Sequence, residues 1–107
     1  MPSIAHRYGG PVIRNVVLGR LHADADAALL EQGLAALRAL RIEGLERLEC
    51  GRDAGLREGN WDYAVTAVVA DEEAYRRYDE DEEHNRIRAE LLGPVSEQVA
   101  RVQFVVD

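Results

Sequence analysis

The chain has 107 residues and a mass of 11.9 kDa, which is enough for one small domain and too little for a second hydrophobic core. Its residues are 47% hydrophobic and 31% charged, a balance typical of folded soluble domains and far from that of disordered chains. The net charge of −7 argues against nucleic acid and anionic membranes as partners, because both would repel the protein.

The N-terminal part of the sequence predicts a leader followed by a strand. Residues 1–11 contain a Gly-Gly-Pro breaker and show neither helical nor strand periodicity, so we expect a flexible leader before a domain over residues 12–107. Residues 12–21 are rich in β-branched side chains and are apolar on both alternating faces. This pattern predicts a strand that is covered on both sides.

A helix and a second strand are expected next. Asp24 or Asp26 can cap a helix that continues to about Arg41, with a stripe of alanine and leucine on one side. Gly44 stands where a left-handed helix stop is expected. Residues 45–52 then alternate apolar and charged side chains, which predicts a strand and, after it, a long hairpin connection.

The C-terminal half predicts a strand, a helical region and a last strand. Residues 61–70 form the clearest strand pattern of the chain, and both of its faces are apolar. Asp71 is a suitable N-cap for a short helix that ends near Asp79. Helical spacing resumes around residues 87–92 until a Gly-Pro pair stops it, and residues 99–106 predict the fourth strand.

The predicted order β-α-β-β-α-β is that of an α+β, ferredoxin-like domain, a four-stranded antiparallel sheet with helices on one face. The helices leave the other face of the sheet open. Because the first and third predicted strands are apolar on both sides, we expect the open face to pack against the same face of a second copy, which gives a homodimer.

Three segments together resemble the stress-responsive α/β-barrel family, also called the Dabb domain. They are the strand at residues 13–18, the Trp-Asp-Tyr-Ala sequence at 61–64, and the Ala-Tyr-Arg-Arg-Tyr sequence at 74–78 with His84 after it. The resemblance covers about residues 12–107. It implies a dimeric α/β barrel made of two sheets, in which each protomer keeps a pocket between its sheet and its helices.

The resemblance also implies a candidate chemistry. Some members are plant polyketide cyclases, which close a ring by aldol condensation with a tyrosine and a histidine at the positions of Tyr78 and His84. Many members have a histidine where this chain has Asn15, and a His-Pro pair where it has Asp81-Glu82. An asparagine can form hydrogen bonds but cannot transfer protons near neutral pH.

His84 and Tyr78 are the candidate catalytic residues. Imidazole titrates near neutral pH, and we expect the neighbouring carboxylates to favour its protonated form. The Tyr78 hydroxyl can donate a hydrogen bond to an enolate or carbonyl oxygen. The alternatives are a structural histidine beside the acidic run and a tyrosine that only packs in the core. The residues expected to line a ligand pocket are Asn15, Val17, Tyr63, Val65 and Tyr75.

Other site types find little support in the sequence. The acidic run at residues 79–83 lacks the glycine and the alternating ligands of a calcium loop, and the three histidines lack zinc-ligand spacing, so we expect no metal and no cofactor. Cys50 is the only cysteine, which rules out an internal disulfide, and its position on an apolar strand face predicts an inert thiol. No apolar run approaches the ~18 residues of a membrane span, and the N-terminus lacks a secretion signal, so we expect a cytoplasmic protein.

These observations lead to three functional hypotheses for a homodimer that holds a small apolar or aromatic, polyketide-like molecule. The first is a cofactor-independent cyclase or isomerase in which His84 moves a proton and Tyr78 polarises an oxygen. The second is a non-catalytic stress-related dimer that stores or carries the ligand, which the residues at Asn15 and Asp81-Glu82 favour. The third is a cofactor-free monooxygenase of aromatic compounds, to which Trp61 and Tyr78 give slight support.

Overall fold

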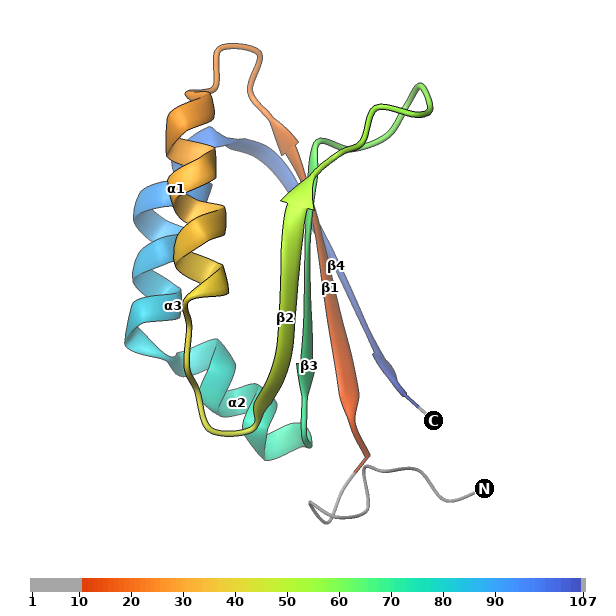
Figure 1. The fold of residues 1–107 in the computed structure, drawn as a ribbon, viewed down its shortest axis with the longest axis vertical. Coiled ribbons are helices and arrows are strands. Elements are labelled where there is room, and N and C mark those ends of the chain that lie inside the picture. Colours follow the sequence, from red (N-terminus) through yellow and green to blue (C-terminus); the bar gives the residue numbers. More distant parts are fainter. Residues whose placement is uncertain (1–10, 107) are drawn as a thin grey trace.

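The computed structural model describes residues 11–106 as a four-stranded antiparallel sheet with all helices on one of its faces (Figure 1). Of the leader expected over residues 1–11, all but Pro11 lies outside the described residues, as does Asp107. The elements are β1 (Ile13–Leu21), α1 (Ala27–Arg38), β2 (Leu45–Arg52), β3 (Tyr63–Val69), α2 (Glu72–Glu80), α3 (Glu82–Ile87), a π-helical turn (Arg88–Leu92), a 3₁₀ turn (Gly93–Val95) and β4 (Ser96–Val105). The predicted order is confirmed, with the second helical region divided into several parts.

The sheet has the strand order β2-β3-β1-β4, so that β1 and β3 form its centre. Val17 of β1 lies opposite Val65 of β3 on one side and opposite Arg101 of β4 on the other. Residues that lie opposite one another in an antiparallel pair point to the same face of the sheet. Asn15 pairs in the same way with Gln103 of β4, and it therefore shares the helix-facing side with Val17.

Carboxylate caps start the helices where the sequence predicts them. The Asp26 side chain accepts hydrogen bonds from the backbone N–H groups of Ala28 and Leu29 at the start of α1. Asp71 accepts one from Ala74 N at 2.8 Å at the start of α2. Each cap satisfies backbone donors that have no partner inside the helix.

Several element boundaries differ from the sequence-based expectation. Helix α1 ends at Arg38 and not near Arg41. Gly44 does adopt a left-handed conformation, with φ +86°, but it lies in the turn that leads into β2 and does not stop the helix. A Cβ there would lie 2.4 Å from the Cβ of Ala74, so the turn also needs glycine for space. Strand β4 begins at Ser96, three residues before the predicted start, because the 3₁₀ turn leads directly into it.

The core lies between the helix-facing side of the sheet and the helices. Leu30, Leu34 and Leu37 form the buried stripe of α1, and each is at most 1% exposed. They pack in one cluster with residues of the central strand β3 and of the C-terminal helical region. The described chain contains no helix that is long and apolar enough to cross a membrane.

Gly19 in β1 provides the space that the Tyr63 ring occupies. A Cβ at Gly19 would lie 2.0 Å from two ring carbons of Tyr63, which is the residue opposite it in β3. At Gly51 in β2, no other atom lies within 4 Å of the position that a Cβ would occupy. The two strand glycines therefore differ in what a methyl group would displace.

We expect Gly19→Ala to destabilise the protein by about 1–3 kcal/mol, because the methyl group must push aside a buried ring. Gly51→Ala is the matched control and should change the free energy of unfolding by less than about 0.5 kcal/mol. Urea denaturation at one fixed protein concentration measures both variants. Equal stability of the two variants would contradict this account of Gly19.

Candidate functional site

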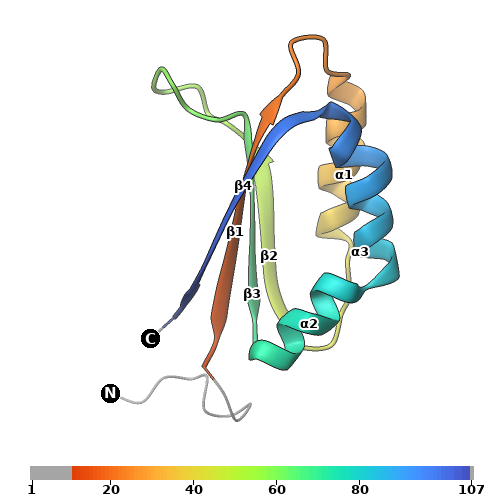
Figure 2. The same cartoon turned by 180° about the vertical axis from the view of Figure 1, so that it is seen from behind.

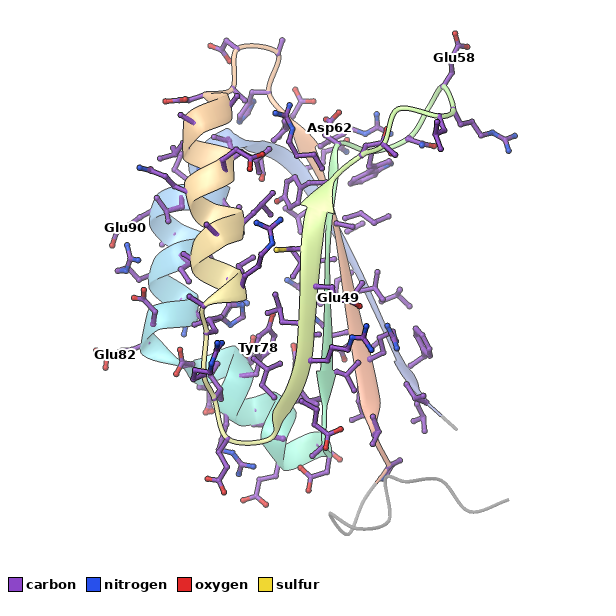
Figure 3. All side chains as sticks on the ribbon, viewed as in Figure 1. Glu49, Glu58, Asp62, Tyr78, Glu82 and Glu90 are labelled. Carbon is purple, nitrogen blue, oxygen red and sulfur yellow. The ribbon has the colours of Figure 1, made fainter. Side chains whose placement is uncertain are left out.

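A cavity of about 360 Å³ lies between the helix-facing side of the sheet and the helical layer. The seven residues selected from the sequence as catalytic or ligand-binding all line it. They are Asn15, Val17, Tyr63, Val65, Tyr75, Tyr78 and His84. Figure 3 shows Tyr78 in the space between helices and sheet, whereas Glu82 and Glu90 project from the outer side of the helices. The structure thus brings together residues from two central strands and from the helical region.

The helical region breaks at Asp81, and this break places His84. Asp81 has an extended backbone, with ψ 130°, where α2 ends and α3 begins. Its carboxylate accepts a hydrogen bond from the backbone N–H of His84 at 2.9 Å. The sequence predicts a solvated helix end at this acidic run, but Asp81 has a more specific role as the N-cap of α3.

The His84 ring is held in one tautomer. Its Nδ1 lies 2.7 Å from the backbone carbonyl oxygen of Tyr78. Because a carbonyl only accepts, Nδ1 carries the proton, and in the neutral ring Nε2 is left as an acceptor. No described residue forms a hydrogen bond with Nε2, and no fully buried side-chain nitrogen or oxygen of the described chain is unpaired, so Nε2 stays open to the cavity that His84 lines.

Burial lowers the pKa of His84, and this outweighs the hydrogen bond to the Tyr78 carbonyl and the nearby carboxylates, which act in the opposite direction. His84 is 4% exposed. The carboxylates of Asp79 and Asp81 do favour the protonated form, as the sequence predicts, but burial has the larger effect on the pKa of His84. At neutral pH the imidazole is uncharged, which is the form that can accept a proton.

The Tyr78 ring stacks on the His84 ring, with ring centroids 4.0 Å apart and planes inclined by 25°. Burial is the main cause that raises the pKa of Tyr78 to about 12. The hydroxyl stays protonated across the physiological range and has no hydrogen-bond partner among residues 11–106. The Tyr75 ring lies further from Tyr78 than the His84 ring does, with a centroid distance of 6.4 Å.

Three further polar residues of the cavity, Tyr63, Ser96 and Asn15, are already paired inside the protein. Ser96 Oγ donates to the carbonyl oxygen of Leu92 at 2.7 Å, so the Tyr63 hydroxyl is the donor in its own 2.7 Å contact with Ser96 Oγ. Gln103 Nε2 donates to Asn15 Oδ1 at 2.8 Å. Asn15 is 2% exposed, so it is a buried amide that the neighbouring strand β4 fixes in place.

The sequence did not predict the charged residues at the rim of the cavity, Arg88 and Arg101. It also did not predict the polar partners Ser96 and Gln103. Arg88, in the π-helical turn, donates to Asp79 through Nη1 at 3.3 Å to the carboxylate and through Nη2 at 2.9 Å to the carbonyl oxygen. Arg101 also lines the cavity. Ser96 was missed because the last strand was expected to start later. Alternation along that strand does place Arg101 and Gln103 on one face, but it does not tell which face meets the helices.

The described residues do not form a metal centre, since no three His, Cys, Asp or Glu side chains among them are grouped to hold an ion. Cys50 is half-buried, and its Sγ donates to the carbonyl oxygen of Leu34 at 3.4 Å. Burial raises the pKa of this thiol. The thiolate is therefore disfavoured near neutral pH.

The fold and the cavity together define a ferredoxin-like α+β domain with an internal small-molecule-sized site. The sequence model of the stress responsive A/B barrel domain, Dabb, matches residues 13–106. The chain belongs to this family, and the resemblance noted in the sequence is confirmed. No curated protein sequence matches the chain significantly.

Solved structures with a similar fold include proteins with different descriptions. A dimeric ferredoxin-like protein of unknown function from Thermobifida fusca superposes with a TM-score of 0.82 at 29% identity, over 92% of this chain and 93% of that one. A hydroxynitrile lyase from Passiflora edulis has a TM-score of 0.76 at 13% identity, over 91% and 94%. A cofactor-independent oxygenase from Streptomyces nogalater has a TM-score of 0.64 at 19% identity, over 91% and 94%. The last two likenesses show the shared fold alone.

The lowered pKa of His84 predicts a pH dependence of stability. The folded state binds a proton at His84 less readily than the unfolded chain, whose histidine pKa is about 6.5, so stability is lost as the pH falls below about 6.5. His84→Asn keeps a donor for the Tyr78 carbonyl but does not titrate. We expect its denaturation midpoint to depend less on pH between about 5 and 6.5.

His22→Asn is the matched control for this measurement, because it replaces an exposed histidine that does not line the cavity. Titration of the ring proton signals by NMR measures the pKa of His84 directly. A value above that of a free histidine would contradict the role assigned to burial.

Proposed function

We propose that the protein is a cofactor-independent acid–base enzyme, of the cyclase or isomerase type, that acts on a small apolar or aromatic molecule in the cavity. The observation that carries this proposal is the pairing of a neutral His84, whose Nε2 is open to the cavity, with the protonated Tyr78 hydroxyl stacked beside it. Removal of a proton from the carbon next to a carbonyl requires a general base and a hydrogen-bond donor to the carbonyl oxygen, placed close together.

In the proposed reaction, His84 Nε2 removes a proton from a carbon atom next to a substrate carbonyl. The electron pair of the broken C–H bond forms a C=C bond, and the π pair of the carbonyl moves onto its oxygen, to which the Tyr78 hydroxyl donates a hydrogen bond. The resulting enolate attacks a second carbonyl of the same molecule in a cyclase, or receives the proton back at another carbon in an isomerase. The imidazolium returns its proton in both cases, so the reaction consumes no oxidant and no cofactor.

A second candidate is a non-catalytic dimer that binds and carries the ligand. Its support is that several polar groups of the cavity, Tyr63 and Asn15 among them, are already paired inside the protein and leave a largely apolar surface for a ligand. Asn15 also cannot exchange protons near neutral pH. Saturable binding without any acceleration of proton transfer would favour this function over the enzyme.

A cofactor-free oxygenase is the third candidate, and it differs from the others in consuming molecular oxygen. Tyr78 lines the cavity, whereas Trp61 lies at the end of the hairpin loop, where the Arg20 guanidinium lies 4.6 Å from its ring centre. Trp61 is not among the residues that line this cavity, which weakens its support for oxidation there. An oxygen electrode with aromatic phenols as substrates tests this candidate separately.

Kemp elimination of 5-nitrobenzisoxazole tests the proposed enzyme without knowledge of its substrate. In this reaction a base removes the carbon-bound proton, the N–O bond breaks, and 2-cyano-4-nitrophenolate forms. We expect His84→Asn to lower the catalysed rate by about 10²-fold. Tyr78→Phe should lower it by roughly tenfold, since one hydrogen bond to the departing oxygen is lost.

The pH profile of the same reaction carries the second part of the test. The wild-type rate should rise with a midpoint below that of free histidine and then stay level through about pH 9, because Tyr78 ionises only near 12. His22→Asn should react like the wild type, since the exposed His22 is not among the residues that line the cavity. A His84→Asn rate equal to that of the wild type would rule out His84 as the base.

We also propose that two copies associate through the open face of the sheet. This face carries apolar side chains on β1 and β4, of which Leu18 is 38%, Val102 59% and Phe104 48% exposed. Figure 2 shows the face free of helices, with the loop between β2 and β3 projecting from the ends of these strands to the side away from the helices. The similar protein from Thermobifida fusca is described as dimeric, which supports the proposal.

Native mass spectrometry tests this association. The wild type should have twice the mass of the 11.9 kDa chain, and Val102→Asp or Phe104→Asp should shift it to the monomer, because a carboxylate would be buried without a partner. Ala35→Asp on the exposed side of α1 is the control and should remain dimeric. A monomeric wild type would overturn the dimer.

A further inference from the structure

Arg101 lies at one end of a row of side chains that crosses the helix-facing side of the sheet. Val65 of β3, Val17 of β1 and Arg101 of β4 are successive cross-strand neighbours, and all three line the cavity. Neighbouring strands are about 4.8 Å apart, so the row spans about 10 Å from β3 to β4. Two apolar side chains therefore form a floor that ends in a guanidinium group at the edge strand.

The charges around the cavity leave Arg101 without a counterion. Three charged side chains line the cavity, namely Asp79, Arg88 and Arg101, and the first two are paired with each other. Arg101 is exposed at the rim and forms no hydrogen bond or ion pair within the described chain. One uncompensated positive charge thus lies beside an apolar cavity, in a protein whose overall charge is −7.

We propose that the ligand of this cavity carries a carboxylate, which Arg101 binds at the rim while the apolar part of the ligand lies over Val17 and Val65. The inference rests on the proposed function, since it concerns the same cavity. A guanidinium presents parallel N–H donors that match the two oxygens of a carboxylate, and such a pair fixes orientation as well as position. Arg101 is thereby a positioning residue, because it determines which carbon of the ligand faces His84.

Arg101 lines the same cavity as Tyr78 and His84, which agrees with this arrangement. The positive charge of Arg101 is close enough to act against the rise in the pKa of the Tyr78 hydroxyl. A carboxylate bound to Arg101 would therefore lie at the cavity that the two candidate catalytic side chains line. Because neutral His84 carries no positive charge, it does not compete with Arg101 for a carboxylate. Arg101 is therefore the unpaired cation of the cavity to which a carboxylate can bind.

A pair of probes with the same aromatic part tests the proposal, namely 2-naphthoic acid and the uncharged 2-naphthamide. We expect the wild type to bind the acid about tenfold more tightly than the amide in isothermal titration calorimetry, a preference that should decrease as salt is added. Arg101→Gln should abolish the preference by weakening the acid only. Arg57→Gln, which removes the same charge from the exposed hairpin loop, should keep it.

Methyl NMR spectra show where the probes bind. The signals of Val17, Val65 and Val99, which line the cavity, should shift, and those of Val16 and Val102 on the opposite face should not. Three outcomes would overturn the proposal: neither probe binds, the wild type binds both equally, or Arg101→Gln weakens both to the same extent.

The same titrations separate this inference from the proposed enzyme activity. His84→Asn removes the candidate base but leaves Arg101 in place, so it should retain the preference for the acid. If it retains both this preference and the wild-type rate of Kemp elimination, the acid–base function fails and the carboxylate site stands. If the preference is absent in the wild type while His84→Asn loses its rate, the opposite conclusion holds.

Discussion

The arrangement of the site depends on the break in the helical region at Asp81. A continuous helix would use the Tyr78 carbonyl in its own hydrogen-bond ladder, but α2 ends at Glu80, and the carbonyl accepts only a long bond of 3.4 Å from the backbone N–H of Asp81. His84 Nδ1 is the second and closer donor to this carbonyl, at 2.7 Å, and Asp81 caps the next helix through the backbone of His84 itself. One interruption of the chain thus stacks the tyrosine on the histidine, fixes the tautomer and starts α3.

Several polar groups that line the cavity already bind partners inside the protein, and this limits which groups a ligand can reach. The Tyr63 hydroxyl is used by Ser96, the Asn15 carbonyl oxygen by Gln103, and Asp79 by Arg88. These internal pairs hold strands and helices at fixed positions around the space, which keeps the lining rigid. His84 Nε2 and the Tyr78 hydroxyl differ from them in having no partner among the described residues.

Much of the fold follows from local patterns in the sequence, and part of the site does not. Residues 45–52 alternate so clearly that the predicted strand and β2 coincide, and Asp71 caps α2 as its position suggests. Near Asp81 the pattern gives an acidic run without indicating which carboxylate turns inward, since this depends on where the chain bends. The lowered pKa of His84 was not predicted for a related reason: neighbours in sequence reveal charge, whereas burial results from tertiary packing.

The bond from His84 Nδ1 to a main-chain carbonyl also limits how long a proton can stay on the ring. A carbonyl carries no net charge, so it stabilises a buried imidazolium less than a carboxylate would. The carboxylate of Asp79 at the cavity is already bound to Arg88 and offers little compensation. In the proposed reaction, this weak stabilisation of the charged ring would favour return of its proton to the intermediate. Such a site suits reactions in which the base removes a proton from the substrate and returns it to the same molecule within one turnover.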